Sequence, residues 1–479
     1  TSNVKRFSSR HTNTPSERPR LILDYVVPPL GACCFPDGSC ADLSATQCAA
    51  AGGTYQGDGT ECATTSCALA LTPFLDPLPL PGVASPVTGS PGAAAHYRMV
   101  MEEHFQQLHS ELPPTRVWGY NGSYPGPTIE AFRDAPVTVR WVNDIRVQET
   151  AQLRTQHVLA VDTCLHGPNM TGVVPVTVTH LHGGKVPMGS DGYPEDTFAP
   201  GDSAALYHYP NIQPAGTLWY HDHALGITRL NVMMGLAGFY LLRDSNELAL
   251  NLPAGEYELP LAIQDKSFNA DGSMQYPDHF EDHFFGDKVL VNGKVWPYHN
   301  VKQGKYRLRL LNGSNSRVYT LKFSNTMPMT LIGVELGLRE TPLVLDSITM
   351  LPGERYDMIV DFASYAAGTE IYLVNSAPAP YPGFPGVGVI PDVMKFIVQG
   401  TPGFTGPVPD TLAVVETLQP AHADEERLFE LFTIDPLPCE GPAHPVWSIN
   451  GLRWDTITER PILGATEIWT WHNQSGISH

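Results

Sequence analysis

Val117-Trp118-Gly119-Tyr120-Asn121-Gly122 is followed, after a turn-rich stretch, by the alternating segment Val137-Thr138-Val139-Arg140-Trp141-Val142-Asn143. The same pattern returns twice, first as Val289-Leu290-Val291-Asn292-Gly293 with residues 306–312, then as Val446-Trp447-Ser448-Ile449-Asn450-Gly451 with residues 467–473. Alternating apolar and polar side chains predict half-buried strands, and Asn-Gly is a strong turn signal. One Asn-Gly is a common turn, but three recurrences with matched downstream strands favour three tandem β-sandwiches or barrels.

Composition agrees with an all-β chain of short strands. Of the 479 residues, 43 are Gly and 44 are Pro, and both residue types interrupt long helices. Charged residues make up 16% and hydrophobic residues 42%, which excludes a disordered polyampholyte. No apolar run is long enough to cross a bilayer, so we expect no transmembrane segment. The net charge of -20 repels phosphate backbones and argues against nucleic acid as a partner.

The repeats set the expected domain boundaries. We expect a tail or linker (1–30), a Cys-rich module (31–67), a Pro-rich brace (68–94), a first repeat (95–245), a second repeat (246–400), a linker (401–423) and the start of a third repeat (424–479). A sandwich of this kind needs about 100–150 residues, so the third repeat is expected to be incomplete. We therefore expect the natural protein to continue roughly 100 residues past His479.

Six of the eight cysteines fall in the segment 31–67, namely Cys33, Cys34, Cys40, Cys48, Cys62 and Cys67. A dense, even set in a Gly-, Asp- and Thr-rich segment predicts a small disulfide-linked module, and hence an extracytoplasmic protein. The pairing stays open among 15 connectivities. A zinc knuckle is the alternative, but the segment has no His and no repeated C-x2-C pair. The remaining two, Cys164 and Cys439, are either free and buried or join the first and third repeats.

Two His-x-His pairs, His180-Leu181-His182 and His221-Asp222-His223, are the main chemical signal. On a strand, residues i and i+2 face the same side, so each pair presents two imidazoles to one point. One such pair is typical of a solvated strand face, but two pairs in one repeat favour a metal. Neutral imidazoles without a nearby thiolate suit copper, zinc or non-haem iron. Gly183 and Gly184, which follow the first pair, indicate that backbone approaches the site closely.

The segments around these histidines resemble the first two copper motifs of the three-domain multicopper oxidases. The resemblance is carried by His180-Leu181-His182-Gly183-Gly184, by residues 219–232, by residues 112–130 and by Ser190-Asp191-Gly192-Tyr193-Pro194-Glu195. It covers roughly residues 71–479 and is nearest to the bacterial spore-coat laccases and bilirubin oxidases. It implies cupredoxin-like domains and four copper ions in the intact protein. A type 1 copper would accept electrons from a reducing substrate, while a type 2 copper and a type 3 pair would reduce O2 to water.

The resemblance also implies a role for each matching residue. His180 would bind the type 2 copper, and His182, His221 and His223 would bind the type 3 pair. Asp191 would help to deliver protons, although a simple turn role in Ser-Asp-Gly is equally consistent with the sequence. His479 matches the opening of a His-Pro-x-His-x-His motif and would be the first type 1 ligand. The type 1 Cys and the other cluster histidines would lie past His479, so residues 1–479 alone are expected not to turn over O2.

The sequence therefore predicts a laccase-like multicopper oxidase whose partners are O2 and a small reducing substrate. Phenols, bilirubin-like pigments, Mn(II) and Cu(I) all remain possible donors, and the oligomeric state stays open. One alternative is a copper-binding or coat-type structural protein that lacks a type 1 centre. Another is a different copper enzyme on the same domains, such as a nitrite reductase. The second repeat has no His-x-His pair and is expected to contribute little chemistry.

Two further groups of residues receive structural interpretations. His279 and His283 have the i,i+4 spacing of a helical metal site, but no helix signal surrounds them, so we expect a polar loop. Met233 and Met234 follow a predicted strand and are expected in the core rather than at a metal.

Overall fold

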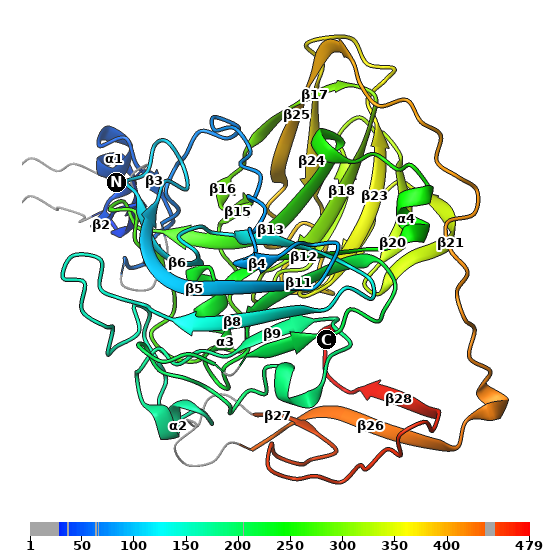
Figure 1. Ribbon diagram of the computed structural model, residues 1–479. Coiled ribbons are helices and arrows are strands. Elements are labelled where there is room, and N and C mark those ends of the chain that lie inside the picture. Colours follow the sequence, from blue (N-terminus) through cyan, green and yellow to red (C-terminus); the bar gives the residue numbers. More distant parts are fainter. Residues whose placement is uncertain (1–27, 36–37, 63–64, 66, 205, 436–445) are drawn as a thin grey trace, which may run out of the picture. The chain divides into compact units, whose positions relative to one another are not determined.

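The computed structural model describes residues 28–35, 38–62, 65, 67–204, 206–435 and 446–479 (Figure 1). The chain divides into two compact units, Thr1–Ala70 and Leu71–His479. Nearly all regular structure is β, which confirms the predicted fold class. Within the described ranges, no helix is both long enough and apolar enough to pass through a bilayer.

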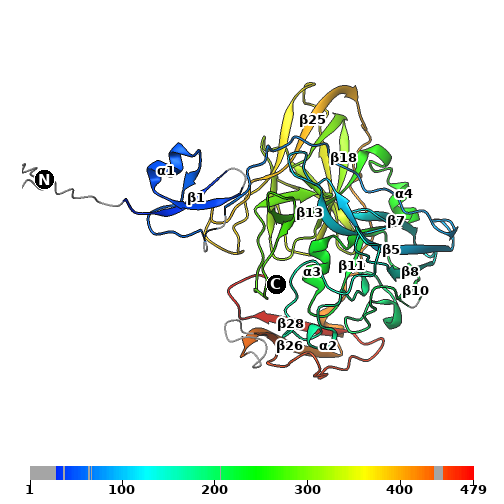
Figure 2. The same ribbon diagram turned by 90° about the vertical axis from the view of Figure 1, so that its left-hand side faces the viewer.

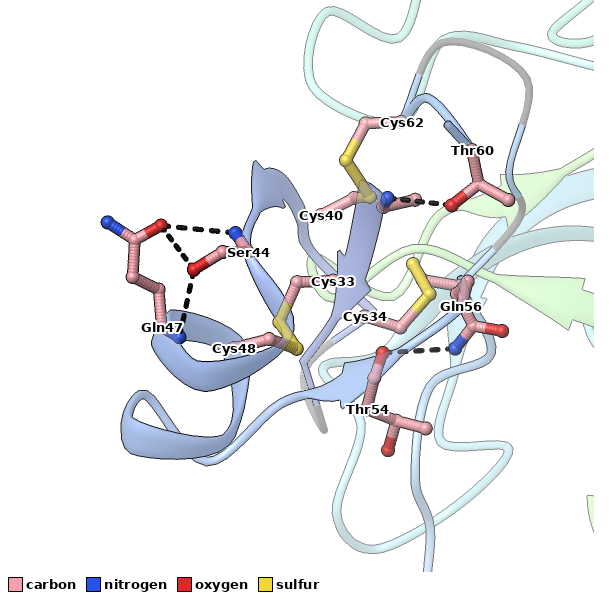
Figure 3. Close-up of a disulfide and its surroundings, with 12 residues drawn as sticks. Cys33, Cys34, Cys40, Ser44, Gln47, Cys48, Thr54, Gln56, Thr60 and Cys62 are labelled. Carbon is pink, nitrogen blue, oxygen red and sulfur yellow. Dashed lines mark hydrogen bonds between the residues drawn. A yellow bond between two sulfur atoms is a disulfide. The ribbon is translucent and has the colours of Figure 1, made fainter. Parts of the chain in front are cut away.

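The smaller unit is built around three disulfides (Figure 3). A sheet in the order β2-β1-β3 is formed by β1 (Gly31–Cys34), β2 (Cys40–Leu43) and β3 (Thr54–Tyr55). Helix α1 (Ala45–Ala50) begins with a capping box in which Ser44 and Gln47 bind each other's backbone N–H groups. The bridges are Cys33–Cys48, Cys34–Cys67 and Cys40–Cys62. The predicted six-cysteine disulfide module is confirmed, and one of the 15 possible pairings is selected.

The first repeat consists of two packed sheets (Figure 2). One contains β4 (Thr88–Gly89), β5 (Ala95–Gln106), β6 (Thr115–Tyr120), β8 (Val137–Asn143) and β10 (Tyr207–Tyr209). The other, in the order β7-β12-β11-β9, contains β7 (Gly126–Phe132), β9 (Thr179–His182), β11 (Gly216–Asp222) and β12 (Ala237–Arg243). The rings of Tyr120, Trp141 and Tyr220 meet in the core between the sheets, with centroids 4.9–5.4 Å apart.

The second and third repeats supply the remaining strands of this unit. One sheet of the second repeat contains β13 (Glu258–Phe268), β14 (Met274–Gln275), β15 (Lys288–Val291), β16 (Lys294–Val295), β18 (Lys305–Asn312), β20 (Met329–Val334), β21 (Gly337–Leu345) and β23 (Arg355–Asp361). The other contains β17 (Tyr298–Gln303), β19 (Tyr319–Phe323), β22 (Ile348–Met350), β24 (Glu370–Asn375) and β25 (Asp392–Pro402). In the third repeat, β26 (Glu425–Ile434) pairs with β27 (Val446–Ile449) and β28 (Glu467–Asn473).

The three Asn-Gly turns have the same geometry, which explains why this dipeptide marks the repeat. Asn121, Asn292 and Asn450 have φ of 51°, 50° and 54°, in the left-handed region that Asn tolerates. Each side-chain oxygen accepts a 2.8 Å hydrogen bond from a backbone N–H of the neighbouring strand, at Val100, Ala262 and Glu430 respectively. Those strands, β5, β13 and β26, then pair in parallel with β8, β18 and β28. The same local geometry thus occurs three times in this chain. The exact domain boundaries remain predictions.

The Pro-rich segment lies extended along the first two repeats, as an extended brace should. The backbone N–H of Leu78 donates to Tyr298 of the second repeat, and that of Ala84 donates to Thr128 of the first. Residues 77 and 83 form parallel bridges to the same two strands. The segment therefore contacts both repeats through backbone hydrogen bonds.

A buried charge network joins the first two repeats. Arg309 is 1% exposed and donates to Glu247 at 2.6 Å, to Glu258 at 2.8 Å and to Thr217 of β11 at 3.0 Å. Arg307 donates to the same Glu247 at 2.7 Å and, through two nitrogens, to Asp357. Each buried charge thus has opposite charges within hydrogen-bond distance, which offsets its desolvation.

The described part of the larger unit contains few helices, and all of them are short. They are α2 (Pro168–Thr171), α3 (Thr228–Met234), α4 (Ser245–Ala249) and the 3-10 turns η2 (Met188–Ser190), η3 (Gly255–Tyr257) and η4 (Pro420–His422). Met233 and Met234 are 3% and 0% exposed, which confirms the core interpretation, although they lie in α3 rather than just after a strand. Cys164 is disulfide-bonded, whereas Cys439 lies outside the described residues, so a link between repeats stays a prediction.

Candidate metal centre

Both His-x-His pairs lie on neighbouring strands of one sheet. Strand β9 pairs antiparallel with β11, with His180 opposite His221 and His182 opposite Trp219. His223 follows the end of β11, and its backbone N–H donates to Val178 at 2.7 Å. The alternation of a strand and this register together bring the two pairs to the same face of the sheet.

The four imidazoles form one compact group. The ring centroid of His180 lies 5.7 Å from that of His182, 5.6 Å from that of His221 and 4.8 Å from that of His223. One nitrogen from each of His180, His182 and His221 lies within 4.8 Å of the others. Nitrogens that share one ion at about 2.0–2.1 Å each are separated by no more than about 4.2 Å, so the group is close to a metal-binding geometry.

Backbone carbonyls orient two of these rings. Nδ1 of His180 lies 2.6 Å from the carbonyl oxygen of Asp191, and Nδ1 of His221 lies 2.7 Å from that of Asp222. A carbonyl oxygen accepts only, so each Nδ1 carries the proton and donates it. Nε2 of His180 is therefore left with a free lone pair, as a metal ligand requires, whereas Nε2 of His221 faces Nδ1 of His182 at 3.3 Å.

Burial favours the uncharged form of three of the four imidazoles. It lowers the pKa of His182 to about 3, and the nearby Arg355 guanidinium adds to the effect. Burial also lowers the pKa of His221 well below its usual value, and lowers the pKa of His223 less strongly. Neutral imidazole is the form that binds a metal ion, so these three rings are ready to bind one at neutral pH.

The arrangement fits a copper or other imidazole-binding metal. Nδ1 of His223 is buried and finds no hydrogen-bond partner among the residues that the structure describes. A buried polar atom without a partner costs free energy, which a bound metal ion would recover. Trp219 stacks against His182 at 5.3 Å and His221 at 4.1 Å, so both rings are held by packing as well as by hydrogen bonds.

Asp222, between the two histidines of the second pair, was not singled out by the sequence. Its carboxylate is 0% exposed and accepts hydrogen bonds from the backbone N–H groups of Val178 and Ala224 and from the side chain of Asn231. Burial raises the pKa of Asp222 to about 7. The carboxylate links the approach to β9, the end of β11 and helix α3, and so fixes the backbone around His221 and His223. An acidic residue flanked by two histidines was the available signal in the sequence.

The second repeat contributes a residue that the sequence interpretation missed. Arg355, 1% exposed, donates from Nε to the backbone carbonyl of Thr217 on β11. A Cβ on Gly183 would lie 2.7 Å from a terminal nitrogen of this guanidinium, and Gly183 has a φ of +84°. The close backbone approach predicted at Gly183 is therefore real. The approaching group is an arginine from another repeat, which no local pattern could reveal.

Asp191 lies in a turn beside the four histidines. This position is compatible with both roles considered from the sequence, proton delivery and a simple turn. Its backbone N–H closes the turn onto Met188, and its carboxylate oxygen Oδ1 lies 3.4 Å from Nδ1 of His180. Because the Asp191 side chain is 52% exposed, it faces solvent on one side and a centre histidine on the other.

His479 lies in a different cavity of about 350 Å³, lined in part by His283, Tyr381 and Trp447 and by none of the four histidines. Burial lowers the pKa of His479, and His283 lowers it further. His279 and His283 belong to an irregular segment, which confirms the predicted polar loop. The structure therefore groups four of the five predicted metal ligands and leaves the fifth apart.

Models of known families match most of the larger unit. Two models, both described as multicopper oxidase, match residues 103–171 and 169–247 in one case and residues 243–381 in the other. These ranges contain all four histidines of the centre, together with Asp222 and Arg355.

Known proteins resemble the chain over most of its length. It is 39% identical to a laccase of Bacillus stratosphericus, over 85% of this chain and 82% of that protein. It is also 39% identical to a laccase of Bacillus subtilis (strain 168), over 86% and 82% respectively. The crystal structure of the McoA multicopper oxidase of Aquifex aeolicus is similar with a TM-score of 0.68 and 26% identity, and the match covers 85% of this chain and 83% of that one.

Proposed function

This chain belongs to the multicopper oxidase family, and we propose that its four first-repeat histidines hold copper ions at which O2 is reduced. It is a laccase-like oxidoreductase that uses copper, O2 and a reducing substrate. The observation that carries the assignment is the single group of imidazoles presented by β9 and the end of β11. The family relationship favours this function over a copper-binding structural protein.

Each histidine has a proposed role in the centre. His180 would hold a type 2 copper, and His182, His221 and His223 would contribute to a type 3 pair. Copper, when bound, accepts electrons one at a time and passes them to O2. Arg355 and Asp222 act through the ligands: Arg355 binds the backbone of β11, and Asp222 binds the segments on either side of the second pair. These buried contacts fix the imidazoles before a metal binds.

Asp191 is proposed to hold and deliver protons at Oδ1. Reduction of O2 to water consumes four protons, and a half-exposed carboxylate next to His180 can receive them from solvent. In the copper-loaded natural protein, Asp191→Asn should slow O2 consumption by about tenfold or more and leave the copper content unchanged. Unchanged O2 consumption would leave Asp191 with the turn role alone.

The cavity at His479 is the proposed place where the electron donor binds. It has a volume of about 350 Å³ and combines His283 and Asp282 with Tyr381 and Trp447. Both a small aromatic donor and a metal ion fit that chemistry, so the donor class stays open. An extracytoplasmic location is proposed from the three disulfides of the smaller unit, because disulfides persist in oxidising compartments.

Copper titration tests the assignment of the centre. The chain is titrated with Cu(II), and bound copper is measured by elemental analysis and electron paramagnetic resonance. The double variant His180→Ala/His221→Ala should lose most of the copper bound by the wild type. The control His96→Gln removes a first-repeat histidine that binds Thr138 instead of the centre, and it should bind copper as the wild type does. Equal copper binding by both variants would contradict the assignment.

A further inference from the structure

A second group of metal-ligating side chains lies outside the four-histidine centre, where the first and third repeats meet. His166 precedes α2, Glu195 follows η2, and Asp455 follows β27. Each offers one ligand atom, and the three atoms lie within 4.8 Å of one another. The group therefore draws two ligands from the first repeat and one from the third.

His166 provides a buried nitrogen that nothing in the described ranges satisfies. Its Nε2 is enclosed and has no hydrogen-bond partner there. The nearest carboxylate oxygen, Oε1 of Glu195, lies 3.6 Å away, which is too long for a hydrogen bond. Leaving a buried ring nitrogen unpaired costs free energy, and a metal ion between the nitrogen and the carboxylates would recover it.

The two carboxylates lack a countercharge. Across the described part of the chain, no Lys or Arg forms an ion pair with Glu195 or Asp455, and Glu195 interacts with His166 and with the Tyr193 hydroxyl. Both residues are exposed, so solvent screens part of the repulsion between their carboxylates, and a bound cation would neutralise the rest. The segments that carry them are already packed together, because the ring of Tyr193 lies 6.0 Å from that of Trp454.

The chemistry of the three ligands favours one class of metal ion. One imidazole and two carboxylates suit a first-row divalent cation such as Zn²⁺, which binds three protein ligands and completes its coordination with water. Ca²⁺ prefers oxygen ligands only and more of them. A cavity of about 670 Å³ borders His166 and Asp455 and leaves room for the ion and its water.

We propose that His166, Glu195 and Asp455 form a Zn²⁺-type divalent cation site that links the first repeat to the third. The site is separate from the copper centre and does not depend on the proposed donor or proton path. Its effect is structural: a bound ion holds the turn after β27 against the loops before α2 and after η2.

Zinc binding to the copper-free chain tests the proposal. Copper is left out because Cu²⁺ binds imidazole and carboxylate ligands more tightly than Zn²⁺ does and would fill the proposed site, whereas any Zn²⁺ at the four-histidine centre is common to the wild type and the variants. Zinc is measured by elemental analysis after gel filtration, and its affinity by calorimetry. The wild type should retain one more Zn²⁺ per chain than Asp455→Asn or His166→Gln. Asp455→Asn and His166→Gln should each weaken Zn²⁺ binding by more than about tenfold, since even an outer partner of a metal ligand is worth ~10–100-fold.

A matched control removes the same charge from the same region. Glu459 lines the same cavity but does not belong to the ligand group, so Glu459→Gln should retain Zn²⁺ with wild-type affinity. An excess of Ca²⁺ should not displace the Zn²⁺. The proposal is overturned if the wild type retains no Zn²⁺, if all three variants bind it equally, or if Ca²⁺ displaces it. A near-ultraviolet circular dichroism spectrum unchanged by each substitution confirms that the variants are folded.

Discussion

The first and second repeats share one framework and differ in what their strands carry. In both, an Asn in the left-handed region binds the neighbouring strand through its side chain, at Val100 in one and at Ala262 in the other. The first repeat then presents four imidazoles on β9 and β11. The second presents buried arginines that contact the first repeat at Thr217. The comparison shows that the shared framework sets the fold of both repeats. The function depends on a few strand residues: the first repeat supplies the candidate metal ligands, and the second supplies arginines that support them.

The largest effect should come from breaking the support offered by the second repeat. Arg309→Ala leaves Glu247 and Glu258 buried without one of their partners, which should lower the free energy of unfolding by about 3–5 kcal/mol. Urea denaturation followed by tryptophan fluorescence measures the loss. Lys302→Ala, which removes an exposed ion pair with Glu256, is the control and should cost at most about 1 kcal/mol. Similar losses in both variants would mean that the buried network gives no special support.

A somewhat smaller effect is expected from Asp222→Ala in the first repeat. This substitution leaves the backbone N–H groups of Val178 and Ala224 without their acceptor, at about 1–3 kcal/mol each. It should therefore destabilise the chain by about 2–4 kcal/mol and weaken copper binding as well. Calorimetric titration with Cu(II) measures the second effect. Wild-type copper affinity in a destabilised variant would show that Asp222 supports the fold but not the ligands.

Gly183→Ala tests the point where the two repeats touch. Gly183 has a positive φ, which alanine adopts only with strain, and the added Cβ would lie 2.7 Å from the Arg355 guanidinium. We therefore expect the free energy of unfolding to fall by about 1–3 kcal/mol. Gly82→Ala is the matched control, because a Cβ there meets no atom within 4 Å and its φ is not positive. Chemical denaturation measures the free energy of unfolding of both variants. Equal values would show that the contact between Gly183 and Arg355 does not restrict the residue at position 183.

The smallest effect for one pH unit concerns His157, which hydrogen-bonds Asn231 behind the four-histidine centre. Burial lowers the pKa of His157 to about 4, below the usual value of about 6.5. Between these values the unfolded chain binds the additional proton, so stability rises with pH by up to about 1.4 kcal/mol per pH unit. His157→Gln should reduce the slope between pH 4 and 6.5, and the lowered pKa values of His182 and His221 should keep part of it. Urea midpoints across that range measure it, and an unchanged slope would contradict the prediction.

The sequence predicted those parts of the structure that depend on local geometry. Asn-Gly identified the three repeats because one left-handed Asn and its side-chain hydrogen bond make each turn. His180 and His182 were predicted to act together because alternate residues of a strand share a face. The domain boundaries and the roles of the individual ligands remain predictions.

Contacts between distant segments could not be predicted in the same way. Arg355 reaches β11 from 138 residues away in the chain, and nothing in its own segment indicates this. Asn231 contacts Asp222 because α3 folds back over the end of β11. The disulfide pairing of Cys33, Cys34 and Cys40 likewise depends on the order β2-β1-β3, which six spacings alone do not determine.

X-ray absorption spectroscopy of the copper-loaded chain tests the central claim most directly, namely that the four histidines form one copper centre. We predict nitrogen ligands at about 2.0 Å with the outer-shell scattering of imidazole rings. That signal should disappear in a variant that carries alanine at residues 180, 182, 221 and 223. An unchanged spectrum and copper content in the four-fold variant would place the copper elsewhere and contradict the account.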